Sequence, residues 1–144
     1  MSRLHQAIEA SLDAVPAMGE AVRRLCLTEG VDATEASLVE LALVEAVTNT
    51  IEHGYRGAHG RVEIDLCVTP DRIAAEIHDT APPVEPERLA APVRSDEALA
   101  DRTQLEERGR GLEIIHGVFD EVTYQRTDAG NHLALSRLRR GATA

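Results

Sequence analysis

The feature that most constrains the fold of this chain is a strict alternation of apolar and polar residues over residues 61–69. The apolar positions are Val62, Ile64, Leu66 and Val68, and between them lie Glu63, Asp65 and Cys67. Because successive side chains of a strand point to opposite faces, the pattern predicts a strand with one buried face and one accessible face. Pro70 and Asp71 favour a turn, so residues 72–78 return as a second strand. The chain must therefore build a sheet that is covered on one side.

Helical periodicity indicates which segments cover that sheet. Pro16 suits the start of a helix whose apolar residues recur at helical spacing, and Gly30 is a natural end for it. The segment 32–35 has an Asp-x-x-Glu arrangement typical of a capping box. It precedes a longer predicted helix over about 35–53, which ends before Gly54.

The rest of the chain completes a mixed arrangement. Residues 3–11 partly alternate and predict an edge strand, and residues 111–119 predict a third helix. Two short strands, 122–126 and 132–137, flank a turn and form a final hairpin. Strands adjacent in sequence with helices on one face indicate an antiparallel-rich α+β sandwich. A length of 144 residues suits one domain, 1–144.

Charge and composition exclude several classes of protein. The formal net charge is −10, which disfavours non-specific binding to nucleic acid. Lys is absent, so the chain has no P-loop lysine. Apolar stretches are too short to cross a membrane, and residues 1–6 lack the apolar core of a signal peptide, which predicts a cytoplasmic protein. Cys26 and Cys67 have apolar neighbours and are expected to be reduced thiols in the core.

The long predicted helix carries the densest chemistry. Glu45, Asn49 and His53 are spaced i, i+4 and i+8, so they form one polar stripe on a regular helix. A carboxylate and an amide oxygen stacked in this way can bind a hydrated Mg²⁺ or orient a proton acceptor. The alternative is a solvated helix face. Asn is a poor helix former, so its place at mid-helix favours a specific role.

Two further segments suggest ligand contacts. Asp79 ends the second strand, where a carboxylate can accept a hydrogen bond from an exocyclic amine such as that of adenine, or simply initiate a turn. Gly109-Arg110-Gly111-Leu112 leads into the third helix, where glycines permit close backbone approach and the helix N-terminus attracts phosphate. The alternative is an ordinary loop-to-helix entry. The long segment 80–109, rich in Pro and charge, is expected to be functional or mobile.

Together and in this order, these segments resemble the sequence boxes of the GHKL ATPase superfamily, and most closely anti-sigma-factor serine kinases of the RsbW/SpoIIAB type. The resemblance covers residues 5–140 approximately. The segments that carry it are Leu43-Val44-Glu45-Ala46-Val47-Thr48-Asn49 with His53-Gly54-Tyr55, then Ile77-His78-Asp79-Thr80-Ala81-Pro82-Pro83, and then Gly109-Arg110-Gly111-Leu112-Glu113-Ile114-Ile115.

The resemblance implies a Bergerat fold, a two-layer sandwich of helices on one face of a mixed, mostly antiparallel sheet, with a lid at about 80–110. It implies ATP and Mg²⁺ as cofactors, with Glu45 as the catalytic general base and Asn49 as the Mg²⁺ ligand. Asp79 would recognise the adenine amine. The remaining nucleotide contacts would come from His53, Ala81, Gly109, Arg110, Gly111 and Leu112.

The implied function is an ATP-dependent protein serine/threonine kinase and anti-sigma factor of a partner-switching module. Its partners would be a STAS-type antagonist protein and a sigma factor or similar regulator, with a homodimer as a further expectation. One departure is Ala81, which replaces the glycine of the D-x-G box and resists positive φ. It leaves two alternatives: a partner-sequestering module with a degenerate nucleotide site, and a slow ATPase. A second departure is Asn131-His132, where many members place a threonine near adenine.

Overall fold

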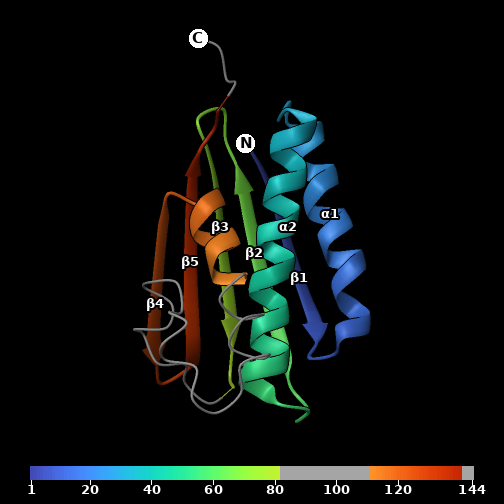
Figure 1. The fold of residues 1–144 in the computed structure, drawn as a ribbon, viewed down its shortest axis with the longest axis vertical. Coiled ribbons are helices and arrows are strands. Elements are labelled where there is room, and N and C mark those ends of the chain that lie inside the picture. Colours follow the sequence, from blue (N-terminus) through green and yellow to red (C-terminus); the bar gives the residue numbers. More distant parts are fainter. Residues whose placement is uncertain (82–110, 141–144) are drawn as a thin grey trace.

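A computed structural model describes residues 1–81 and 111–140, which form a five-stranded sheet with helices on one face (Figure 1). All four strand pairings are antiparallel. We expected a mixed, mostly antiparallel sheet, and among the described residues every strand pair is antiparallel. In spatial order the strands are β1 (Ser2–Glu9), β2 (Arg61–Val68), β3 (Arg72–Asp79), β5 (Gly130–Leu138) and β4 (Glu121–Thr127).

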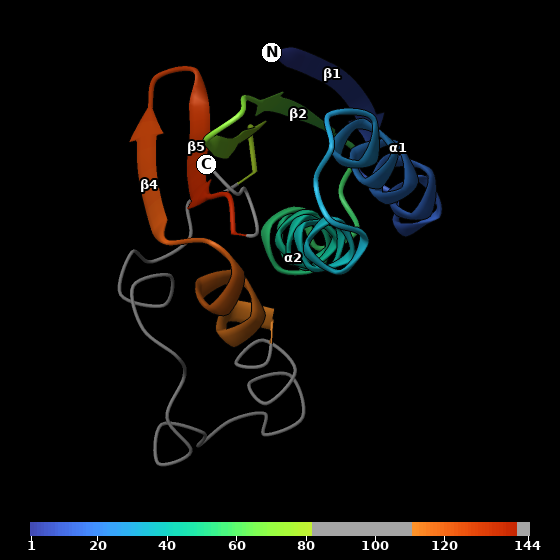
Figure 2. The ribbon, with the colours of Figure 1, turned by 90° about the horizontal axis from the view of Figure 1, so that it is seen from above.

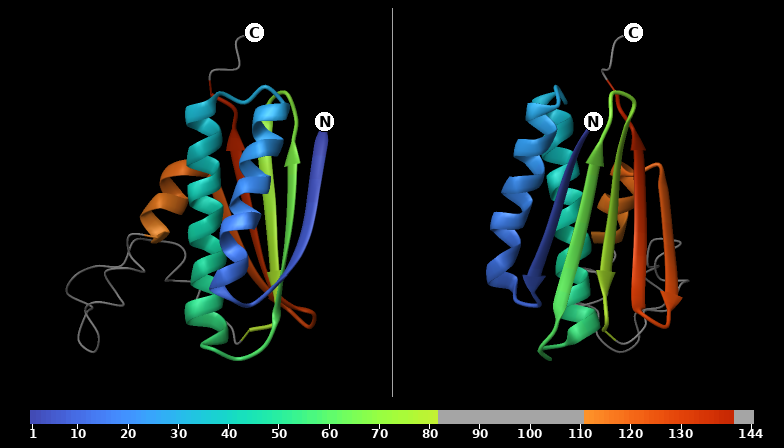
Figure 3. Two further views of the ribbon diagram at one scale, coloured as in Figure 1. Left: turned by 90° about the vertical axis from the view of Figure 1, so that its right-hand side faces the viewer. Right: turned by 180° about the vertical axis from the view of Figure 1, so that it is seen from behind.

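The helices lie together on one side of this sheet (Figures 2 and 3). They are α1 (Val15–Thr28), preceded by a 3₁₀ turn (Leu12–Ala14), α2 (Ala33–Asn49), and a short helix over 111–118. Alternate residues of β2 and β3 face them and are buried, which confirms the half-buried strands predicted from the alternation. The core between the layers is mostly aliphatic, with Phe119 the largest of its fully buried side chains.

The two cysteines differ in burial. Cys26 on α1 is fully buried and reduced, as predicted. Burial raises the pKa of its thiol to about 11, and the nearby Glu35 carboxylate adds to the shift. Cys67 is also a free thiol, but the prediction that it lies in the core is wrong. It is half-buried on the opposite face of the sheet, because it occupies a polar position in the alternation of β2.

The start of α2 differs in one respect from the predicted capping box. The Asp32 side chain caps the helix, accepting hydrogen bonds from the backbone of Thr34 at 3.0 Å and of Glu35 at 3.4 Å. Glu35 does not return to the cap. It is 5% exposed and accepts hydrogen bonds from Arg137 Nε at 2.8 Å and from the backbone of Arg140 at 2.9 Å. A buried ion pair between α2 and β5 thus replaces half of the box.

The end of α2 also departs from the prediction of a regular helix to residue 53. The α-helix stops at Asn49, and a π-helical turn continues over Thr50–Tyr55. The backbone N–H of Arg56 bonds to the carbonyl of Ile51 at 3.2 Å, an i to i−5 bond, and Arg56 takes a left-handed φ of 53°. Gly54 therefore lies inside the helical segment rather than ending it. Such π turns inside helices occur frequently at functional sites.

No helix in residues 1–81 or 111–140 is long and apolar enough to span a bilayer.

Candidate functional site

Glu45 and Asn49 lie one turn apart near the C-terminal end of α2, on the part of the helix that core residues do not cover. Both side chains are half-buried. Neither makes a hydrogen bond or an ion pair with another residue in the described part of the chain. Because both side chains are partly open to solvent and have no partner among the described residues, the carboxylate and the amide are available to a ligand.

Gly111 brings a second segment against this pair. It is buried and begins the helix over 111–118. A Cβ atom on Gly111 would lie 3.1 Å from Glu45 Oε2 and 3.2 Å from Asn49 Nδ2, so glycine is what allows this approach. Gly109 and Arg110, and nearly all of the expected lid, lie outside the described residues. Leu112 packs its side chain in the core, which leaves only its backbone to face a ligand.

Asp79 ends β3 on the helix-covered face of the sheet. Its Oδ1 accepts hydrogen bonds from Asn131 Nδ2 at 2.7 Å and from the backbone of Ala81 at 2.9 Å. Its Oδ2 accepts no hydrogen bond from the residues described. Burial raises the pKa of Asp79 above its ordinary value, although the bonds from Asn131 and Ala81 oppose the shift. The carboxylate is thus oriented through one oxygen and keeps the other for a donor from outside.

Ala81 is enclosed by its neighbours. Its carbonyl accepts hydrogen bonds from Asn131 Nδ2 at 2.8 Å and Arg126 Nη1 at 3.0 Å. A Cβ atom on Gly54 would lie 3.1 Å from the Cβ of Ala81. The glycine at the end of the helical segment therefore contacts the loop after Asp79, which joins two of the predicted boxes directly.

Three residues that sequence reasoning did not assign hold this region together. Tyr55 accepts a hydrogen bond from the backbone of Thr80 at 3.0 Å and donates one to the carbonyl of Arg61 at 2.7 Å. Tyr124 donates to Asn131 Oδ1 at 2.5 Å, and Arg126 donates to the same oxygen at 3.2 Å. Tyr55 belongs to the quoted motif, which is a usable signal. Nothing in the local pattern of β4 indicates that Tyr124 and Arg126 meet Asn131.

His53 lies in the π turn, four residues after Asn49. Its side chain is 14% exposed, and its Nε2 lies 3.9 Å from Glu52.

The donor set fits the implied cofactors. Carboxylate and amide oxygens are ligands that Mg²⁺ accepts, and Mg²⁺ keeps water and phosphate oxygens for its other positions. The free Oδ2 of Asp79 is an acceptor suited to an amine. Gly111 brings its backbone directly against Glu45 and Asn49, as the phosphate-contacting segment implied by the resemblance would require.

Comparisons with known proteins agree with the fold. The chain resembles the RsbU and RsbW domains of Rv1364c from Mycobacterium tuberculosis, a crystal structure, with a TM-score of 0.66 and 18% sequence identity over 97% of the chain. The match covers 33% of that protein, so this chain spans about a third of its length. No curated protein matches the chain significantly. The sequence model of the histidine kinase-like ATPase domain matches residues 8–137. The chain therefore belongs to the histidine kinase-like ATPase domain family, as the GHKL resemblance predicted.

Proposed function

We propose that this chain is an ATP-dependent protein serine/threonine kinase that acts as an anti-sigma factor in a partner-switching module. The observation that carries the proposal is that Glu45 and Asn49 lie against Gly111 and have no partner among residues 1–81 and 111–140. A histidine kinase-like ATPase domain binds ATP, and a free carboxylate beside the metal-binding amide is what transfer to a hydroxyl needs.

Each residue has one task in this proposal. The Oδ2 atom of Asp79 accepts a hydrogen bond from the adenine amine, and Asn49 contributes one oxygen to Mg²⁺. When bound, Mg²⁺ neutralises phosphate charge. Glu45 takes the proton of the acceptor serine or threonine hydroxyl while that oxygen bonds to the γ-phosphorus and the bond to the leaving ADP oxygen breaks. The nitrogen atoms at Gly109, Arg110 and Gly111 contact the phosphates.

The proposed partners follow from the same family assignment. The similar solved structure contains RsbU and RsbW domains in one chain. This supports a regulatory system in which an RsbW-like domain exchanges between a sigma factor and a STAS-type antagonist, which it phosphorylates. A homodimer through a sheet edge or a helical surface is part of the same proposal.

The direct test incubates the full chain with labelled ATP, Mg²⁺ and candidate antagonist proteins. Transfer of label to a serine or threonine of the antagonist is expected, and Glu45→Gln should slow it by about 10²–10⁴-fold, the usual contribution of a general base. The matched control is Glu40→Gln, because Glu40 lies on the same helix but pairs with Arg23 at 3.4 Å. Equal transfer by Glu45→Gln and the wild type contradicts the catalytic role.

A second candidate is a sequestering module with a degenerate nucleotide site. Ala81 favours it, because this residue is buried and its carbonyl is already bound by Asn131 and Arg126. Calorimetry with Mg-ATP separates the two: absence of binding at millimolar ATP supports sequestration. Phosphate release without any protein acceptor would instead indicate a slow ATPase.

A further inference from the structure

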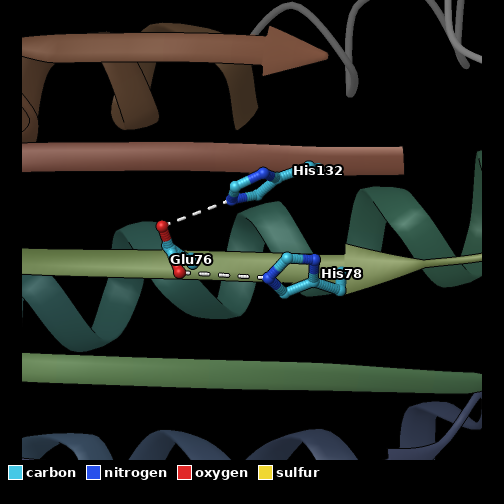
Figure 4. Close-up of side chains that lie close together, drawn as sticks. All are labelled: Glu76, His78 and His132. Atoms are coloured by element: carbon cyan, nitrogen blue, oxygen red, sulfur yellow. Dashed lines mark ion pairs between the residues drawn. The ribbon is translucent and has the colours of Figure 1, made fainter. Parts of the chain in front are cut away.

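The open face of the sheet, opposite the helices, carries a cluster of two histidines and a glutamate. His78 on β3 and His132 on β5 are direct partners in the strand register. Glu76 lies two residues before His78 on the same strand, so the pleat puts its side chain on the same face. Figure 4 shows the two imidazole rings side by side, with the carboxylate of Glu76 beside both.

The three ligand atoms converge. His132 Nε2 lies 3.4 Å from one carboxylate oxygen of Glu76, and His78 Nε2 lies 3.9 Å from the other (Figure 4). One ligand atom from each residue falls within 4.8 Å of the others. The two rings are stacked, with centroids 4.2 Å apart and planes 20° from parallel. Both Nε2 atoms lie on the side of the rings that faces Glu76 (Figure 4).

His132 Nε2 makes no hydrogen bond at 3.4 Å, and 3.9 Å is beyond hydrogen-bond reach, so both separations are compatible with a shared ion. Hydrogen bonds from an imidazole nitrogen to oxygen span about 2.7–3.2 Å. Zinc bonds of about 2.0–2.2 Å keep neighbouring ligand atoms about 3–3.5 Å apart. The longer separation can close by rotation of Glu76, whose side chain is 52% exposed. The cluster is therefore spaced for a metal between its members rather than for direct contact.

The state of His132 supports the same conclusion. Its side chain is only 25% exposed. Its Nε2 atom is buried and has no hydrogen-bond partner in the described residues. A buried ring nitrogen without a partner is uncommon.

We propose that Glu76, His78 and His132 bind a divalent transition-metal ion of the zinc class on the open face of the sheet. Two imidazole nitrogens and one carboxylate suit Zn²⁺ and its neighbours in the Irving–Williams series and disfavour Mg²⁺, which prefers oxygen ligands. The site joins β3 to β5 and leaves coordination positions for water or for a partner's side chain. It is independent of the proposed kinase site, which lies on the other face.

The test uses the full chain without a histidine tag, stripped of metal and titrated with Zn²⁺ against a chromophoric zinc chelator. One Zn²⁺ per chain is expected. His78→Gln, His132→Gln and Glu76→Gln should each weaken binding by roughly tenfold or more. Two controls should bind as the wild type does: His5→Gln, on the same face but paired with Asp65 at 2.6 Å, and His59→Gln, in the exposed segment before β2.

Co²⁺ in place of Zn²⁺ adds a spectroscopic readout, because its visible absorption reports nitrogen ligands and should change in both cluster histidine variants. Thermal unfolding followed by circular dichroism checks that each variant folds. If His132→Gln fails to fold, Glu76→Gln carries the test, because its exposed side chain can be changed without opening the core. The proposal is overturned if the wild type binds no Zn²⁺ at micromolar free metal, or if folded cluster variants bind it as tightly as the wild type.

Discussion

Helix α2 carries acidic side chains near both of its ends, and the structure handles them in opposite ways. Near the N-terminal end, Glu35 is 5% exposed and bound by Arg137 and by the backbone of Arg140. Near the C-terminal end, Glu45 and Asn49 are half-buried and have no partner among the described residues. A glutamate thus meets a protein partner near one end of the helix, and near the other end a glutamate has none among the described residues.

The difference teaches how to separate structural from functional polar residues in this fold. A buried charge that is fully paired contributes to the native arrangement, and removing one partner leaves the other uncompensated. A carboxylate without a partner contributes little to stability and remains free for a ligand or a proton. Stability and activity should therefore respond to different ends of the same helix.

The largest expected effect on stability comes from Glu35→Ala. It leaves Arg137 buried, with its Nη1 still bound to the carbonyl of Val118 but its charge unpaired. The free energy of unfolding should fall by about 3–5 kcal/mol in denaturant titrations. The double variant Glu35→Leu with Arg137→Met is the control, because replacing the whole pair by apolar groups is often neutral. A loss below about 1 kcal/mol for Glu35→Ala would break the comparison.

Asp79→Asn should separate binding from folding. The amide oxygen can still accept the bonds from Asn131 and Ala81, which turns an NH₂ group toward the ligand in place of Oδ2. Adenine nucleotide binding should weaken by about 1–3 kcal/mol, measured by calorimetry, because two donors then face each other. Guanine nucleotides serve as the control for base recognition. Unchanged ATP affinity would remove the adenine role of Asp79.

The same variant gives a pH test with a defined sign. The folded-state pKa of Asp79 is raised, mainly by burial, so the ionised carboxylate disfavours the fold. That cost is present above the raised pKa and disappears as the pH falls through it toward the ordinary value. The stability of the wild type relative to Asp79→Asn should therefore increase on acidification across that window. Parallel pH profiles of unfolding for the two proteins would contradict it.

Asn49→Ala should have a smaller effect. Loss of one uncharged ligand should weaken Mg-ATP binding by about 0.5–1.5 kcal/mol. Binding of ATP in the presence of a chelator should not change, and this serves as the control. Thermal stability should stay the same or rise slightly, because Ala is the better helix former. A clear drop in stability would place Asn49 with the structural residues.

The smallest expected effect concerns the reactivity of the Cys26 thiol, which lies near Glu35. Cys26 has a pKa of about 11 and is fully buried, so at pH 8 it stays protonated and unreactive. A thiol reagent should modify one group per native chain, the half-buried Cys67, and two after unfolding. Glu35→Ala should increase the reactivity of Cys26, because its carboxylate contributes to the raised pKa. Rapid labelling of both thiols in the native wild type would contradict the burial of Cys26.

Periodic patterns in the sequence predicted most of the strands and helices. The alternation of β2 predicted both its pairing and its buried face, and helical spacing located α1 and α2 within a few residues. The same alternation already placed Cys67 on the polar side, so its predicted burial failed because apolar neighbours were given more weight than register. For these strands and helices, the local sequence pattern was sufficient to predict the type of element and its approximate position.

The local sequence pattern could not predict which residues far apart in the chain contact each other. Glu35 fitted a capping box, but Arg137, 102 residues later, binds it instead. The π turn after Asn49 has no local signal in the residues 50–55. Asn131 was noticed only as a departure from the family, and its bonds to Asp79 and Ala81 depend on the β3–β5 register.

The ion pair between Glu35 and Arg137 has a consequence for how the protein is made. During synthesis α2 emerges long before β5, and Glu35 has no counter-charge until the last strand arrives. The same strand delivers Asn131, which orients Asp79. The chain should therefore gain its stability and its nucleotide site in one late step on or after the ribosome, since contacts so distant in sequence close slowly.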